Sequence, residues 1–157
     1  MEAPLQERPA PTETVADAQR SIVDDFLFLD DWTQRYQHLI ELGRQLPPFP
    51  ETSRIEANRI RGCQAGVWLI CDCRNGKLEF EATSDSAIVA GLIALLLKVY
   101  SGRQPEQVLS TSTSFIDEIG LAEHLSPHRA NGLSLMLARI RAFAKAHLPG
   151  NQAGGGA

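Results

Sequence analysis

Hydrophobic residues in the first third of the chain recur at the three- and four-residue spacing that places side chains on one side of an α-helix. Thr14, a residue type that caps helix N-termini, precedes the first such segment. A second segment follows Asp30 and Asp31, whose carboxylates suit the positive end of a helix, and it ends at Gly43 and the proline-rich residues 46–50. The positions expected to face inward are Val15, Ile22, Phe26, Leu27, Trp32, Tyr36, Leu39, Ile40 and Leu42, and those expected to face outward are Gln34, Arg35, Gln37 and Glu41.

The middle of the chain changes to the alternating pattern of β-strands. Residues 67–73 are dense in β-branched, aromatic and aliphatic side chains, and residues 77–83 alternate apolar with charged ones. Asn75-Gly76 between them is a strong signal for a two-residue hairpin. A short extended piece at about residues 58–61 supplies a third strand, so a three-stranded antiparallel sheet is expected. The face of this sheet that needs a cover carries Leu78, Phe80 and Ala82.

Residues 87–100 are apolar nearly all round, which predicts a buried helix that covers the sheet. Ser84 or Asp85 is the expected N-cap. Two short helices are expected next, and a last long helix occupies about residues 126–149. Helices at both ends of one small sheet define an α+β fold, in which the three-stranded sheet packs against N-terminal and C-terminal helices.

The chain has the organisation of a single domain, because 157 residues are enough for one hydrophobic core. Residues 1–13 are rich in Pro, Glu and Ala and are predicted to form a disordered arm. Residues 14–148 form the predicted domain, and the Gly-rich residues 149–157 a flexible tail.

Composition excludes several classes of function. The net charge of −4 and the lack of aromatic residues within a basic run argue against a nucleic-acid partner. The longest apolar run, residues 87–97, is far shorter than the roughly 20 residues of a membrane span. The N-terminus has no apolar segment of the secretory type, and the three cysteines are an odd number, so we expect a reducing compartment, the cytoplasm.

The sequence places one thiol, Cys63, in a loop between Gly62 and Gly66 and just after Arg59 and Arg61. Thiolate is the nucleophilic form of cysteine, and neighbouring arginines favour it. A lone cysteine is more often a small buried hydrophobe, so local chemistry alone favours that structural interpretation.

Four motifs together favour a functional role for Cys63 over the structural interpretation. They are residues 35–47, Gly62-Cys63-Gln64 with residues 67–69, residues 84–92, and residues 124–133. In this order and spacing the chain resembles the SufE family of sulfur-acceptor proteins, over about residues 22–147. The resemblance implies a SufE/IscU-like fold. It also implies that the protein takes persulfide sulfur onto Cys63 from a pyridoxal-phosphate-dependent, SufS-like cysteine desulfurase. The protein is then expected to stimulate that enzyme and to relay the sulfur toward an iron–sulfur cluster scaffold.

The resemblance also assigns roles to neighbouring residues. Arg129 is expected near the thiol, where it positions the loop or stabilises the anionic sulfur; the alternative is an ordinary surface cation. Asp85, Gly62 and Gln64 are expected at the contact with the desulfurase, although capping of the buried helix explains Asp85 equally well.

The chain departs from the family pattern in two places. Ala65 and Gly66 stand where the family usually has Ser-Gln, so side-chain hydrogen bonds that would hold the loop are lost. Cys71 and Cys73 are an added pair that share one face of a strand. We expect them to be ordinary strand residues, with a resolving or soft-metal pair as the alternative.

The sequence has no Gly-rich phosphate loop and no lysine context for pyridoxal phosphate, so no cofactor and no metal of its own are expected. The expected protein is a sulfurtransferase-like carrier, monomeric or weakly dimeric, whose turnover belongs to the complex with the desulfurase. Two alternatives stay open. One is a zinc or iron–sulfur scaffold that uses Cys63, Cys71 and Cys73, and the other is a non-covalent desulfurase adaptor.

Overall fold

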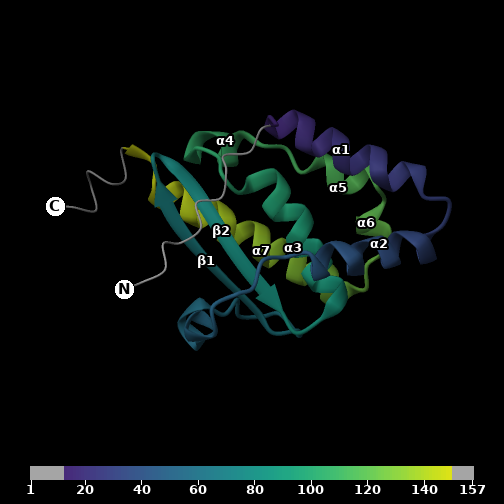
Figure 1. Ribbon diagram of the computed structural model, residues 1–157, viewed down its shortest axis with the longest axis horizontal. Coiled ribbons are helices and arrows are strands. Elements are labelled where there is room, and N and C mark those ends of the chain that lie inside the picture. Colours follow the sequence, from purple (N-terminus) through teal and green to yellow (C-terminus); the bar gives the residue numbers. More distant parts are fainter. Residues whose placement is uncertain (1–12, 150–157) are drawn as a thin grey trace.

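A buried helix, α3 (Ala87–Tyr100), occupies the centre of the fold, and the other elements pack around it (Figure 1). The computed structural model describes residues 13–149. The arm and the tail expected from the sequence lie outside this range, apart from Glu13 and Pro149. Helices α1 (Val15–Phe28) and α2 (Trp32–Arg44) pack against α3, and so do strand β2 (Lys77–Ser84) and the C-terminal helix α7 (Pro127–Ala146).

The class is α+β, with short helices joining the main elements. None of the helices in the described residues is long and apolar enough to cross a membrane. The remaining elements are the 3-10 turns η1 (Glu51–Ser53) and η2 (Glu56–Asn58), strands β1 (Val67–Arg74) and β2 (Lys77–Ser84), and helices α4 (Pro105–Ser110), α5 (Ser114–Glu118), α6 (Leu121–His124) and α7 (Pro127–Ala146).

The sheet is a two-stranded hairpin, so the expectation of a third strand is wrong. β1 and β2 pair antiparallel through the turn at Asn75 and Gly76, whose φ angles of 53° and 77° are those that the sequence signal demands. The expected third strand is reduced to one bridge between Arg59 and Trp68. The segment is too short to pair further, because η2 ends at Asn58 and Gly62 already turns the chain with a φ of 91°.

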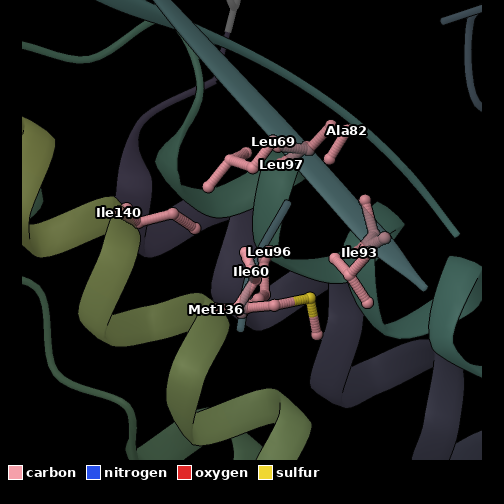
Figure 2. A pocket seen from close by; sticks show the side chains of 9 residues that line it. Ile60, Leu69, Ala82, Ile93, Leu96, Leu97, Met136 and Ile140 are labelled. Carbon is pink, nitrogen blue, oxygen red and sulfur yellow. The ribbon is translucent and has the colours of Figure 1, made fainter. Parts of the chain in front are cut away.

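The apolar face of the hairpin is covered by α3 and α7. Leu78 and Phe80 are fully buried there, and the Phe80 ring meets that of Phe143 from α7 at 6.2 Å. Side chains from both helices and the hairpin converge on a residual cavity of about 10 Å³ (Figure 2), whose apolar lining offers a water molecule no hydrogen-bond partner. The main contacts of the N-terminal helices are with α3, which lies between α2 and the hairpin.

Helix caps follow local sequence, with one exception. Thr14, Asp31 and Ser126 accept hydrogen bonds from the first turns of α1, α2 and α7. The cap of α3 is Ser86, one or two residues later than expected, because Ser84 and Asp85 are engaged elsewhere.

Arg35 of α2 is half-buried, although the helical pattern places it outward. Its guanidinium donates hydrogen bonds to the carbonyl oxygens of Leu29 and Ile119. These carbonyls follow α1 and α5, so the side chain satisfies groups at two helix C-termini.

Helices α2 and α3 approach to backbone contact at two glycines. A Cβ atom on Gly91 would lie 2.2 Å from the carbonyl oxygen of Leu39, and one on Gly43 would lie 2.8 Å from the backbone nitrogen of Gly91. No side chain fits at either position without separating the helices.

We predict that Gly91→Ala destabilises the fold by about 3 kcal/mol, because the added methyl group meets backbone atoms that cannot move aside. Helix propensity alone predicts the opposite, a gain of about 1 kcal/mol. Urea unfolding followed by circular dichroism measures the difference. Gly76→Ala is the control, since its Cβ would meet nothing within 4 Å and only the left-handed backbone costs about 1 kcal/mol. A Gly91→Ala protein as stable as the wild type would contradict this account.

Candidate functional site

Cys63 lies on a loop that joins η2 to β1 and crosses the first half of α7. Gly62 enters this loop with a positive φ, and its carbonyl accepts a hydrogen bond of 3.1 Å from the side-chain amide of Asn131. A Cβ on Gly62 would be 3.1 Å from a methyl carbon of Leu135. The loop therefore begins in direct contact with α7.

The Cys63 thiol is half-buried over Gly132, a residue inside α7 without a side chain. Its Sγ is 3.6 Å from the point that a Cβ of Gly132 would occupy. The thiol borders a cleft of about 410 Å³, which also receives the expected site residues Gln64 and Arg129. The cleft is lined by Cys63, Gln64, Ala65, Val67, Ser86, Val89, Ser126, His128, Arg129 and Gly132.

The far end of the loop is held through the main chain of Gly66. Its amide donates to the carboxylate of Asp85 at 3.0 Å, and its carbonyl accepts from the hydroxyl of Ser84 at 2.7 Å and from the amide of Asp85 at 3.2 Å. Asp85 therefore anchors the loop and does not cap α3. The loop is therefore held at Gly66 without any contribution from a side chain of its own at this position.

The side chain of Trp68 packs against Gly66. A Cβ on Gly66 would lie 2.6 Å from the Trp68 ring and 2.7 Å from the Asp85 carboxylate. The guanidinium of Arg54 lies 4.4 Å from the centre of the same ring and that of Arg59 lies 5.7 Å from it. Cation–π attraction thus joins the chain before the loop to the strand after it.

The pKa of the Cys63 thiol is raised, because partial burial penalises the thiolate more than the charge of Arg59 favours it. Arg59 thus favours the thiolate, as its position in the sequence suggests, but burial of the thiol outweighs its effect on the pKa. Two helix N-termini, at Ser86 of α3 and Ser126 of α7, also line the cleft and present the positive ends of their dipoles.

The structure does not bring Cys71 and Cys73 to this site. Cys71 lies four residue steps beyond Val67 along the extended strand β1, a distance of roughly 13 Å. The pKa of Cys71 is raised to about 12, mainly by burial and further by the neighbouring Cys73 and carboxylates. Across residues 13–149, no three His, Cys, Asp or Glu side chains gather into a possible metal site.

Two functional positions were missed in the sequence: Asn131, which holds the loop, and Gly132, which makes room for the thiol. The sequence does contain a signal for the role of Gly132, because a glycine inside a helical pattern often marks a place where another segment packs closely against the helix. Asn131 carried none, since its partner is a backbone carbonyl 69 residues away.

We predict that Arg59→Gln raises the pKa of Cys63 further, because it removes the charge that opposes burial. The pH dependence of alkylation at Cys63, in a background without Cys71 and Cys73, measures this pKa. The wild-type midpoint should lie above that of the same chain in denaturant. Arg61→Gln is the matched control and should leave the midpoint where it is. An unchanged midpoint in Arg59→Gln would refute the assignment.

We predict that Asp85→Ala loosens the loop at Gly66 without unfolding the protein, because it removes one hydrogen bond worth about 1 kcal/mol. Hydrogen exchange of the Gly66 amide should become about fivefold faster. Asp72→Ala, which removes an exposed carboxylate of β1, is the control and should not change this rate. Equal exchange rates in the Asp85→Ala and wild-type proteins would show that the carboxylate does not hold the loop.

Known proteins match this chain over nearly all of the described fold. A family model named SufE, described as "Fe-S metabolism associated domain", matches residues 20–144. An uncharacterized SufE-like protein of Rhizobium meliloti (strain 1021) is 44% identical over 133 residues, which cover 82% of this chain and 95% of that protein. A second one, of Rhizobium etli, is 43% identical over 129 residues and covers 79% of this chain and 87% of its own.

A solved structure has the same fold. The solution structure of a hypothetical protein from Thermus thermophilus superimposes with a TM-score of 0.69 at 26% identity, and covers 83% of this chain and 95% of its own. The matched region includes the hairpin, the cysteine loop and most of α7. The chain therefore belongs to the SufE family and carries its Fe–S metabolism associated domain.

Proposed function

We propose that this protein accepts persulfide sulfur on Cys63 from a pyridoxal-phosphate-dependent cysteine desulfurase, stimulates that enzyme and relays the sulfur to iron–sulfur cluster assembly. The observation that carries the proposal is the position of the thiol. It borders a 410 Å³ cleft that also receives Arg129 and the first turns of α3 and α7. The cleft has room for one further sulfur atom beside the thiol.

The transfer is a thiol–disulfide exchange. The Cys63 thiolate attacks the outer sulfur of the donor persulfide, forming a new S–S bond to Cys63. The S–S bond of the donor breaks, and its cysteine leaves as a thiolate that takes up the proton lost by Cys63. The exchange converts a donor persulfide and a thiol into a donor thiol and a Cys63 persulfide, with no external oxidant.

Electrostatics support storage of sulfur more than attack by the free protein. The raised pKa of Cys63 keeps the resting thiol protonated and therefore a poor nucleophile toward oxidants and adventitious electrophiles. A persulfide is more acidic than a thiol, so the loaded form carries an anion at the cleft. There Arg129 and the helix N-termini of α3 and α7 supply positive potential. Attack of Cys63 on the donor persulfide then requires that the protein docks to the donor, because docking changes the surroundings of the thiol.

We predict that Cys63→Ser keeps the fold but takes up no sulfur, because a hydroxyl cannot carry a persulfide. The protein is incubated with a cysteine desulfurase and cysteine, its intact mass is measured, and the added sulfur is located by peptide mapping. The wild type should gain one sulfur atom at Cys63. Cys71→Ser/Cys73→Ser is the matched control and should load as the wild type does, in keeping with the high pKa of Cys71.

The same assay separates the alternatives. A Cys63→Ser protein that still stimulates the desulfurase fully would favour a non-covalent adaptor. Sulfur mapped to Cys71 or Cys73, with none on Cys63, would overturn the proposed carrier residue.

A further inference from the structure

A second hollow, also of about 410 Å³, lies further along α7 from the Cys63 cleft, and we name it the arginine groove. One wall is formed by η2 and the segment that follows it, and the other by α7. Its floor is apolar and mostly made of small side chains, and its rim is basic. The floor residues are Leu135, Ala138 and Ala142, and the rim residues are Arg59, Arg61 and Arg139.

The rim carries unneutralised positive charge. Among residues 13–149, no ion pair with a carboxylate involves Arg59, Arg61 or Arg139. Glu56 is the acidic member of the lining, so three positive charges face one negative charge. This excess stands out on a chain whose net charge is −4.

Two of these arginines are held in place by uncharged groups. Arg139 donates to the carbonyl oxygen of Ala57 at 3.3 Å and lies 5.5 Å from the ring centre of Phe143. Arg59 lies 5.7 Å from the ring centre of Trp68. Preorganised cations of this kind lose less side-chain entropy when they bind an anion.

The groove and the cysteine cleft lie along one face of α7, on either side of the place where the loop crosses this helix. Gly132 lies under the Cys63 thiol, Leu135 lies under Gly62, and the floor extends to Ala142. The seven residue steps from Leu135 to Ala142 span about 10 Å of helix. A partner segment of that length in the groove, about two helical turns or three extended residues, ends beside Gly62, the residue next to Cys63.

We propose that the arginine groove binds an acidic segment with apolar side chains on the desulfurase that loads Cys63. The carboxylates of this segment pair with Arg59, Arg61 and Arg139, and its apolar side chains cover the alanine floor. The inference rests on the proposed function, since it identifies the docking surface of the sulfur donor. Rim charges of this kind act chiefly on the association rate and make binding sensitive to salt.

The test compares two double variants of the full chain with equal net charge. Arg61→Glu/Arg139→Glu reverses the rim and leaves Arg59, which acts on the thiol, in place. Arg20→Glu/Arg44→Glu makes the same charge change on the exposed faces of α1 and α2. Binding to the cysteine desulfurase of the same organism is measured by surface plasmon resonance at low and high salt. Loading of Cys63 by inorganic polysulfide, which needs no docking, is measured separately.

Reversal of the rim should weaken binding about tenfold or more at low salt, mainly through a slower association rate, and should flatten the salt dependence. The control variant should stay within about twofold of the wild type. Ala138→Trp, which fills the exposed floor without changing charge, should weaken binding as well. Polysulfide should load Cys63 equally in all of these proteins.

Equal affinity of the rim variant and the wild type would overturn the proposal, and so would equal weakening by both double variants. These outcomes differ from failure of the proposed function, which appears as a wild-type Cys63 that receives no sulfur from the desulfurase despite tight, rim-dependent binding.

Discussion

The contact between the backbones of α2 and α3 is the constraint on which the rest of this structure depends. Because Gly43 and Gly91 have no side chains, the two helices come close enough for α3 to be buried between α2 and the hairpin. Burial fixes the position of α3, and its first turn then reaches the cleft with Ser86 and Val89. A site at the surface is thus located by a contact deep in the fold.

At Cys63 two opposing effects set the chemistry of the thiol. Burial over Gly132 raises its pKa, and the charge of Arg59 lowers it by less. For a nucleophile that must act alone this balance is unfavourable. For a carrier, as proposed above, it is useful, since a protonated thiol resists oxidation until a partner docks. Under the proposed function, docking to the donor controls the reactivity of the thiol.

Local signals in the sequence predict much of the fold and of the site, and they fail where distant segments meet. The hairpin at Asn75-Gly76 depends on neighbouring residues, so its chemistry can be read directly. The prediction of a third strand failed because a strand needs a paired neighbour as well as extended residues. In residues 58–61 the pairing is limited to one bridge, between Arg59 and Trp68. The family resemblance predicted Arg129 near the thiol, and Arg129 lines the cleft. The direction of the shift in the pKa of Cys63 was not predictable, because it depends on how deeply the thiol is buried against α7. The arginine groove was not predictable either, since its walls are separated by more than 70 residues in the sequence.

The two ends of the cysteine loop are held by hydrogen bonds to side chains of other elements. Asn131 binds the carbonyl of Gly62 at one end, and Ser84 and Asp85 bind the backbone of Gly66 at the other. Both ends are thus fixed through main-chain groups, and Cys63 with its neighbours spans the interval between them. If the thiol leaves the cleft to meet a donor while the hydrogen bonds at Gly62 and Gly66 persist, the motion is confined to residues 63–65. A short span between two fixed points limits the reach of the thiol, so the donor must come to the loop. A docking groove beside that loop, along the same helix, meets this requirement.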